Sequence, residues 1–229
     1  MKRKQVPQLI NQGWFPKHLK QLMFEFMSWF VSKVHAAKPF MPVIEQGLQH
    51  TSNHHLINID RKMGAGIETL IPHLPESVTV ENIPLSEMQT EEEGLYTMIN
   101  SFHQFAPAEA RTFLSQIARK KHPLAILEGN NDSLWQLVGM TIILPMTILL
   151  TAPIVRPFRP SRLLFTYLIP ILPIASLLDG FLALFKLYAP KDLDQLVSTI
   201  QVPGYMWESG KRDNGRGGKI MYLLGYPVS

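Results

Sequence analysis

The sequence predicts an α/β fold with a mostly parallel sheet, N-terminal helices and a hydrophobic helical insertion. Three observations support this prediction. Short apolar runs alternate with helical patterns, two strand-like runs near the end flank a Gly-rich loop, and one long uncharged run interrupts the alternation. The length of 229 residues suits one domain with an insertion better than two full domains.

The chain is short of the charged groups that cover a wet surface. Charged residues make up 17% of it, against roughly 25% in an average soluble domain, so we expect part of the protein to meet lipid. The net charge is +4, and the basic residues stand in short groups that are not interleaved with aromatic residues. This pattern indicates no nucleic-acid partner. The sequence has no cysteine, which excludes disulfides, cysteine-ligated zinc and a cysteine nucleophile.

Residues 1–54 are expected to form an N-terminal helical region. Neither a continuous apolar segment nor a small-residue cleavage site follows the basic start, so we interpret this region as mature and cytoplasmic. Over residues 16–36, apolar residues such as Leu22 and Phe26 recur at helical spacing. This pattern favours an amphipathic helix packed on a core over a lipid-facing stripe. A second, shorter helix is expected over residues 38–50.

Strands and helices alternate over residues 55–129 and 179–229, which make up the expected α/β domain. The expected strands are residues 56–59, 77–80, 95–100, 123–128, 204–210 and 219–227. The expected helices are residues 66–74, 106–121 and 181–197. The Gly-rich run over residues 210–218 indicates a solvated hairpin loop, so the last two strands should form an antiparallel edge of the sheet.

Residues 130–178 form the hydrophobic insertion. Residues 133–155 carry no charge and are long enough to cross a bilayer, whereas residues 163–178 are fewer and include two prolines. Between these runs stand Arg156, Arg159 and Arg162. Two full crossings would put the arginines on the outer face, against the positive-inside tendency. A monotopic or re-entrant hairpin with its arginines at phospholipid head groups is favoured, and a buried insertion in a soluble protein is the alternative.

Several runs resemble a known family. They include "GWFPKHL", "INIDRKMGAG", "NSFHQF" and "TYLIP", the last followed by Asp179-Gly180. Together they resemble a membrane-associated bacterial family of class I S-adenosylmethionine-dependent methyltransferases, over nearly the whole chain. In that family's strand order, the insertion follows the fifth-strand candidate, residues 123–128.

The resemblance implies a Rossmann-like methyltransferase sheet that binds S-adenosylmethionine. Asp60 would end the first strand, and Gly64 and Gly66 would form the turn where a backbone without side chains can approach the cofactor. Asn100, at the end of the fourth-strand candidate, is implied as a further cofactor-binding residue. Because the cofactor's sulfonium carries the reactivity, the main task of the fold is to orient the reactants.

The acid that would bind the cofactor's ribose depends on which strand residues 77–80 form. If they form the second strand of the family, Glu81 stands at about the usual distance of 20 residues to accept the ribose hydroxyls. If they form the third strand, the ribose acid is absent. The chain also departs from the family in having Arg61 and Lys62 in the loop, and a strand with its helix is missing before residues 95–100.

Two further residues are candidates for chemistry. His103 follows the fourth-strand candidate and could be a base or a substrate hydrogen-bond partner, or a packing residue. Glu128 ends the strand over residues 123–128 and could point into the same crevice, or cap a neighbouring helix. We expect no metal site, because no carboxylate or cysteine ligands of known geometry accompany three nearby histidines, His50, His54 and His55.

We therefore expect a methyltransferase at the cytoplasmic face of the inner membrane, with the lipid surface as its partner. Its acceptor would be apolar or lipid-like and delivered near the insertion. The alternative is a catalytically degenerate methyltransferase fold that serves as a membrane-bound binding or scaffold module. The missing strand and the two charged loop residues motivate that alternative.

Overall fold

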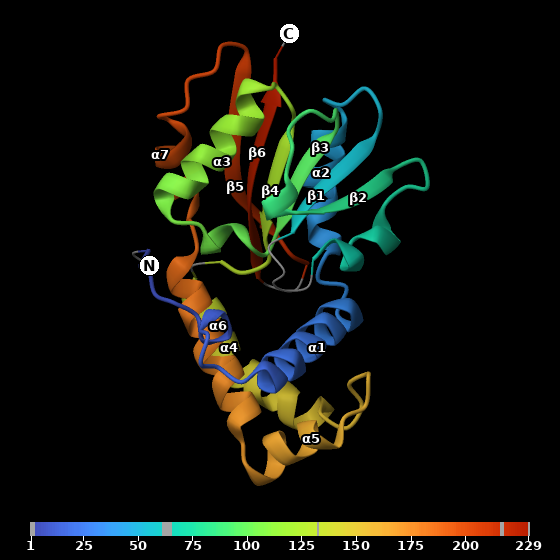
Figure 1. Cartoon of the computed structure of the whole chain (residues 1–229), viewed down its shortest axis with the longest axis vertical. Coiled ribbons are helices and arrows are strands. Elements are labelled where there is room, and N and C mark those ends of the chain that lie inside the picture. The colour runs from blue at the N-terminus through green and yellow to red at the C-terminus, as the bar shows by residue number, and fades with distance from the viewer. Residues whose placement is uncertain (1–2, 61–65, 132, 216–217, 229) are drawn as a thin grey trace. The chain divides into compact units, whose positions relative to one another are not determined.

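The chain folds into two compact units, which we call the helical unit and the sheet unit (Figure 1). The computed structural model describes residues 3–60, 66–131, 133–215 and 218–228. The helical unit comprises Met1–Val34 and Asp132–Leu187, and the sheet unit comprises His35–Asn131 and Tyr188–Ser229. This division differs from the three predicted regions, 1–54, 55–129 with 179–229, and 130–178. The first predicted helix belongs with the insertion, and the second belongs with the sheet.

The sheet unit contains six strands in the order β2-β1-β3-β4-β6-β5. They are β1 (His55–Asp60), β2 (Thr79–Pro84), β3 (Leu95–Ile99), β4 (Leu124–Glu128), β5 (Tyr205–Asp213) and β6 (Lys219–Pro227). Strands β1 to β4 pair in parallel, whereas β6 runs antiparallel to both β4 and β5. The prediction of a mostly parallel sheet with an antiparallel pair at one edge is confirmed, and the fold is Rossmann-like.

Apolar residues alternate between the two faces of the sheet, as the period of two in a β-strand requires. Ile57, Tyr96 and Ile126 pack with α3 (Pro107–Arg119) and α7 (Pro190–Val197) on one face. On the other face, Leu56, Leu95 and Ala125 pack with α2 (Met41–Leu48). Strands β3 and β4 are buried on both faces, and their sequences are apolar apart from Thr97 and Glu128.

The helix predicted over residues 66–74 does not form. Two 3-10 turns, Ile67–Thr69 and Ile71–His73, occupy this stretch, followed by β2 and a third turn, Leu85–Glu87. Pro72 explains the difference, since proline lacks the backbone N–H that an α-helix needs at that position. Residues 66–94, all described, thus hold one strand and no α-helix.

The helix predicted over residues 181–197 divides at Pro190. Its first part ends α6 (Ile171–Lys186), and its second part is α7. Ala189 is extended, with ψ at 159°, because the proline ring disfavours the α conformation in the preceding residue. The helices predicted over 16–36, 38–50 and 106–121 correspond to α1 (Lys17–Lys33), α2 and α3.

The helical unit packs α1 against the insertion. The insertion consists of α4 (Leu134–Thr151), α5 (Pro160–Leu163), a π turn (Leu164–Leu168) and α6. Leu22 and Phe26 of α1 join Ile148 and Leu172 in one apolar cluster, as expected for a helix packed on a core. By length and composition, α4 could cross a membrane, and a bent pair, Pro160–Leu168 with Ile171–Lys186 at 81°, would pass the same test together.

The arginines of the insertion do not all face outward. Arg159 and Arg162 both contact the Glu25 carboxylate, with Nη2–oxygen distances of 2.7 and 2.6 Å. The Arg162 side chain is only 1% exposed, and it also donates to the carbonyls of Val155 and Pro157. The interpretation that places Arg162 at head groups is therefore wrong, because α1 supplies a carboxylate that holds this arginine inside the unit.

Candidate functional site

The strand order creates one switch point. The chain moves from β1 outward to β2 and then returns to the other side of β1 to form β3. In open α/β sheets, ligands bind outside the carboxyl ends of the strands at such a point. Asp60 is the last residue of β1, and Asn100 directly follows β3. The two predicted residues are thus placed at the carboxyl ends of adjacent parallel strands.

Asn100 connects the ends of β3 and β4. Its backbone N–H donates to the Leu127 carbonyl at 2.8 Å, and its side-chain Oδ1 accepts from the Gly129 N–H at 2.8 Å. Its φ of +52° lies in the left-handed region, which asparagine tolerates better than most residues. The residue therefore fixes the turns at the edge where a ligand would bind.

Replacing Asn100 should loosen this edge. We expect Asn100→Ala to lower the free energy of unfolding of the sheet unit by about 1–3 kcal/mol, because the Gly129 N–H loses its acceptor and alanine resists a positive φ. Asn100→Gly should cost less, since only the hydrogen bond is lost. Hydrogen exchange of the β3 and β4 amides measures both. Equal protection in the alanine variant and the unchanged protein would contradict the prediction.

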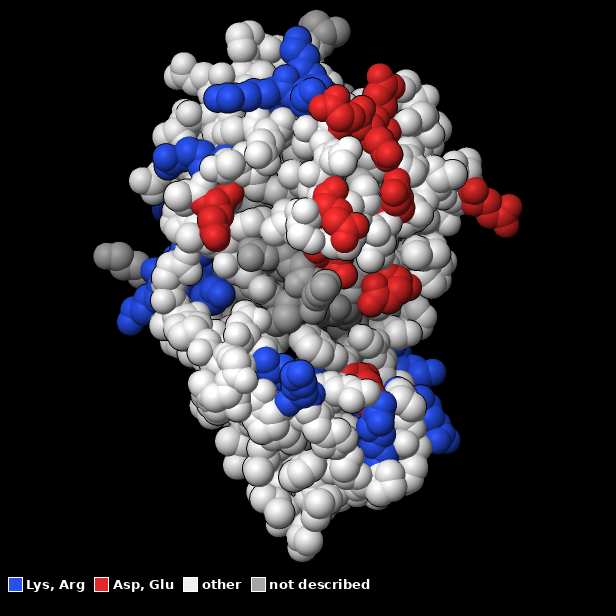
Figure 2. All heavy atoms as spheres, in the orientation of Figure 1, with Lys and Arg blue, Asp and Glu red and all other residues white. Residues whose placement is uncertain are grey.

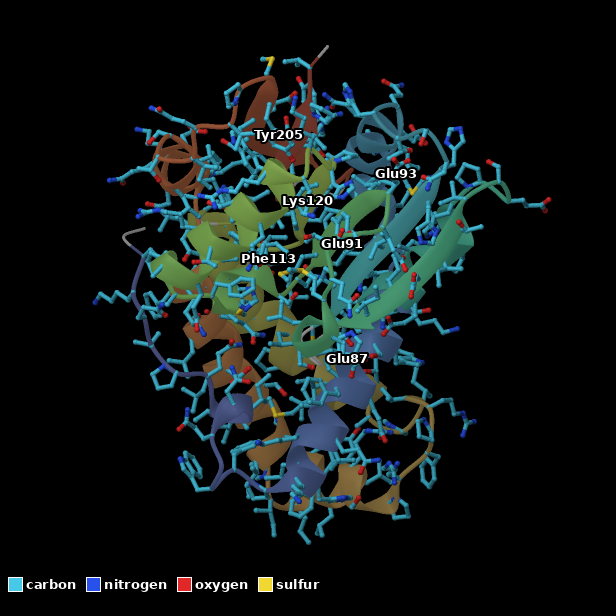
Figure 3. The ribbon with its side chains drawn as sticks, turned by 45° about the horizontal axis from the view of Figure 1, so that its top comes forward. Glu87, Glu91, Glu93, Phe113, Lys120 and Tyr205 are labelled. Carbon is cyan, nitrogen blue, oxygen red and sulfur yellow. The ribbon has the colours of Figure 1, made fainter. Side chains whose placement is uncertain are left out.

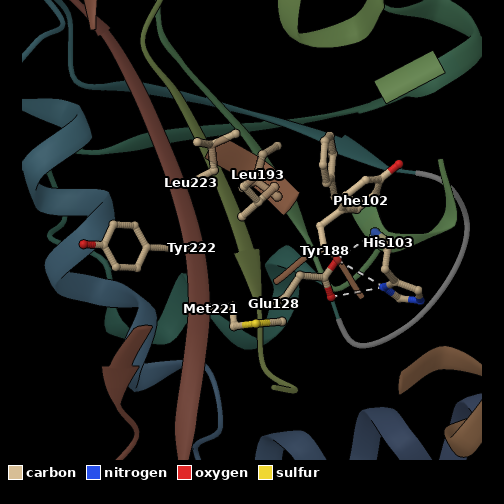
Figure 4. Close-up of a pocket in the computed structure, with 9 residues that line it drawn as sticks. Phe102, His103, Glu128, Tyr188, Leu193, Met221, Tyr222 and Leu223 are labelled. Atoms are coloured by element: carbon tan, nitrogen blue, oxygen red, sulfur yellow. Dashed lines mark hydrogen bonds and ion pairs between the residues drawn. The ribbon is translucent and has the colours of Figure 1, made fainter. Parts of the chain in front are cut away.

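His103 and Glu128 form a buried pair (Figure 4). His103 lies in the 3-10 turn Phe102–Gln104 after β3, and Glu128 is the last residue of β4. The His103 Nδ1 lies 3.1 Å from each carboxylate oxygen, and the backbone N–H of His103 donates to Oε1 at 3.0 Å. The carboxylate thus binds the histidine ring and also holds the turn that carries it.

The pair borders a small cavity. Its internal volume is about 10 Å³, which is room for about one water molecule. Phe102, Tyr188 and Leu193 line it together with the pair, and Tyr188 is held by a hydrogen bond from its hydroxyl to the Phe105 carbonyl at 2.9 Å. A nucleotide-sized cofactor does not fit here, so the cavity can at most admit the reacting end of an acceptor.

The pair has a defined direction of hydrogen bonding. An ionised carboxylate only accepts hydrogen bonds, so Nδ1 of a neutral His103 carries the proton that faces Glu128. The lone pair of the imidazole is then on Nε2, which makes this atom the proton acceptor. Chemically, the arrangement suits a base held in one tautomer.

The predicted Gly-rich turn lies only partly within the described residues. Gly64, Arg61 and Lys62 fall outside them. Gly66 directly precedes the 3-10 turn Ile67–Thr69, and among the described residues a side chain added to it would come within 3.3 Å of the Glu68 Oε2. The predicted approach of a cofactor to this glycine stays a prediction.

Glu81 does not join Asp60. It lies within β2 opposite Ile57, and its carboxylate is 3.5 Å from Nε2 of His55, the first residue of β1. The residue opposite Asp60 is Pro84. The prediction fails geometrically because β2 starts and ends later than the predicted run 77–80, which would have placed Glu81 at the end of the strand.

A carboxylate does follow β2. Glu87 ends the 3-10 turn Leu85–Glu87, three residues beyond Pro84, and it is exposed. Figure 3 labels it separately from Glu91 and Glu93, and Glu91 pairs with Lys120 at 3.0 Å. Counting about 20 residues from Gly66 instead of from Asp60 would have found Glu87.

One group of described residues could hold a metal ion by distance alone. The ligand atoms of His55, Glu81 and Glu92 lie within 4.8 Å of one another. Both carboxylates are exposed, and His55 Nδ1 already contacts the Thr79 hydroxyl at 2.7 Å. These contacts suit a surface ion pair, so we assign no metal here.

Comparisons with known proteins add little to this geometry. No protein-family model and no curated protein matches the chain. Among solved structures, it is similar to a protein from Rhodobacter sphaeroides described as "Putative Zn-dependent Alcohol Dehydrogenases". The identity is 11%, the alignment covers 98% of this chain and 100% of the other, and the TM-score is 0.43. A likeness this distant carries no argument about function.

Proposed function

We propose that this chain is a methyltransferase that uses S-adenosylmethionine. The observation that carries the proposal is the switch point between β1 and β3, with Asp60 and Asn100 at its carboxyl edge. The runs that resemble the methyltransferase family put the Gly-Ala-Gly turn directly after β1 in the sequence. The strand order and the motif thus both support a cofactor site at the carboxyl ends of β1 and β3.

The residues at this edge fit the cofactor if Glu87 replaces Glu81. Gly66 adds no side chain beside the predicted turn, and Asp60 is half-buried at the strand end. Glu87 follows β2 on the same edge. We expect Asp60, Gly66 and Asn100 to lie along the cofactor and Glu87 to accept its ribose hydroxyls. When bound, the cofactor supplies a methyl group activated by its sulfonium.

His103 and Glu128 would act on the acceptor. Glu128 holds the proton on Nδ1, so Nε2 of His103 can take the proton from an acceptor hydroxyl or amine as its oxygen or nitrogen is methylated. We propose an apolar or lipid-like acceptor and a location at the cytoplasmic face of the inner membrane. The support for both is the exposed apolar surface of the helical unit in the same chain.

Calorimetric titration with S-adenosylmethionine and its demethylated product tests the proposal. We expect saturable binding that Gly66→Val weakens at least tenfold, a change of about 1.4 kcal/mol in binding free energy, because a β-branched side chain would occupy the cofactor's volume. Gly13→Val is the matched control, since a side chain there meets nothing within 4 Å. Absence of binding by the unchanged protein at millimolar cofactor would exclude the proposal.

A second candidate is a degenerate methyltransferase fold that serves as a binding or scaffold module. The position of Glu81 inside β2 and the water-sized cavity beside His103 favour it. It predicts no heat of binding with either nucleotide, together with normal folding of both units. The same titration therefore separates the two candidates.

A further inference from the structure

The helical unit exposes a large apolar surface. On α4, every residue of which is described, Ile148 alone is buried. Trp135 is 80% exposed and Leu168, in the π turn, is 77% exposed. We define the apolar face as the following exposed residues of α4, the π turn and the start of α6: Leu134, Trp135, Val138, Ile142, Ile143, Met146, Leu150, Leu164, Tyr167, Leu168, Ile169, Ile171 and Ile174.

The apolar face is wide and uncharged. Successive residues of an α-helix are rotated by about 100°, so the exposed apolar residues from Leu134 to Leu150 cover about half the circumference of α4. In the view of Figure 2, the lowest part of the helical unit, around the turn into α6, carries no blue or red spheres. A face that binds a partner helix is usually a narrower apolar stripe, and a face that binds another protein usually has a polar rim. A face that enters lipid can be wide and can lack a polar rim.

The opposite side of α4 packs against α6, and α6 in turn contacts α1, an amphipathic helix with charged residues. Ile148 and Val155 pack in the same cluster as Leu22 and Phe26 of α1. Lys17, Lys20 and Lys33 also belong to α1, and charged groups at bilayer depth are costly. Because α4 packs on α6 and α6 contacts α1, a bilayer crossing by α4 and α6 would carry α1 into the hydrocarbon, so only the exposed side of α4 can meet lipid.

The arginines add little to this contact. Arg162 is buried and pairs with Glu25, which leaves the Arg159 side chain, 32% exposed, and the exposed Arg156 near the surface. Their attraction to anionic head groups, worth about 1 kcal/mol for each arginine, is smaller than the gain from burying the apolar face. Adhesion has to come from burial of apolar surface, which salt does not screen.

We propose that the apolar face enters one leaflet of a membrane as a monotopic anchor held by lipid acyl chains, not by head-group charge. This inference rests on the proposed function in one point only, namely that the methyl acceptor is lipid-like. The anchor itself requires neither the cofactor nor activity. Failure of the anchor and failure of the methyltransferase proposal can thus be told apart.

Flotation with lipid vesicles, without any nucleotide, tests the anchor. We expect the full chain to float with pure phosphatidylcholine vesicles as well as with vesicles that contain phosphatidylglycerol. A wash in about 1 M salt should not release it. Protein that stays at the bottom with both lipids, or that floats only with the anionic lipid at low salt, would overturn the proposal.

Matched variants locate the contact. Ile142→Gln with Ile143→Gln should reduce the bound fraction at limiting lipid at least tenfold, because both side chains lie on the apolar face. Thr141→Gln, at the neighbouring exposed position of α4, is the control and should bind normally. Equal binding by the double variant and the control would show that this face does not enter the lipid.

Cysteine labelling separates a monotopic anchor from a membrane span. The chain has no cysteine, so Phe158→Cys, at an exposed position between α4 and α5, introduces the only thiol. An impermeant maleimide should label it only from the cytoplasmic side of membrane vesicles. Labelling from the outer side would overturn the single-leaflet arrangement.

Discussion

Removing the Glu25 carboxylate is expected to destabilise the helical unit by about 3–5 kcal/mol, the usual cost of leaving a buried charge without its partner. In Glu25→Ala, the guanidinium of Arg162 keeps its carbonyl contacts to Val155 and Pro157 but loses the ion pair at 2.6 Å. Burial already lowers the pKa of Arg162, and the Glu25 carboxylate opposes that shift. Arginine nevertheless stays protonated in proteins, so the uncompensated charge cannot be relieved by losing a proton.

Two further variants make this prediction specific. In Glu25→Leu with Arg162→Met, both charges are removed, so most of the lost stability should return. Arg156→Gln is the matched control, since Arg156 is an exposed arginine of the same loop, and it should stay within about 0.5 kcal/mol of the unchanged protein. Hydrogen exchange over residues 134–186 in detergent measures all three. A Glu25→Ala variant within about 1 kcal/mol of the unchanged chain would show that water reaches Arg162.

Patterns within one element were enough to predict the centre of the sheet. Strands β3 and β4 are buried on both faces, so their mostly apolar sequences are easily recognised. A crevice shared with His103 was one of two interpretations of Glu128, 25 residues further on, beside a cap on a neighbouring helix. The first needed only the rule that neighbouring parallel strands end on the same side. The structure brings the two side chains together.

Two features could not be predicted from local sequence patterns. They are the end of an exposed strand and a contact between residues far apart in the chain. Strand β2 is an edge strand whose residues are half-buried or exposed, so no burial pattern marked its end, and Glu81 was misplaced for that reason. The contact between Glu25 and Arg162 spans 137 residues. No local pattern tells a buried arginine from one that faces head groups, since both stand in the same Pro-rich and Arg-rich run. The Gly64 turn lies outside the described residues and stays a prediction.

The largest effect on activity is expected from Glu128→Gln. The amide of glutamine would donate to His103 Nδ1, so the histidine's proton would move to Nε2 and the lone pair would no longer face the acceptor. Holding the base in the wrong tautomer should lower the rate by roughly 10²–10⁴-fold, which is the usual contribution of general base catalysis. The fold should tolerate the change, because the amide oxygen can still accept from the backbone N–H of His103, now 3.0 Å from the carboxylate.

Transfer of a labelled methyl group from S-adenosylmethionine into a membrane lipid extract measures this loss. We expect kcat to fall while cofactor affinity stays the same. Glu45→Gln, at an exposed glutamate of α2, is the matched control for the loss of a carboxylate and should keep full activity. If Glu128 were merely structural, the variant would instead lose stability, and the folded fraction would keep the kcat of the unchanged protein. Activity of Glu128→Gln within about threefold of the control, far less than base catalysis contributes, would therefore remove His103 as the base and leave the pair as a contact that joins the turn after β3 to the end of β4.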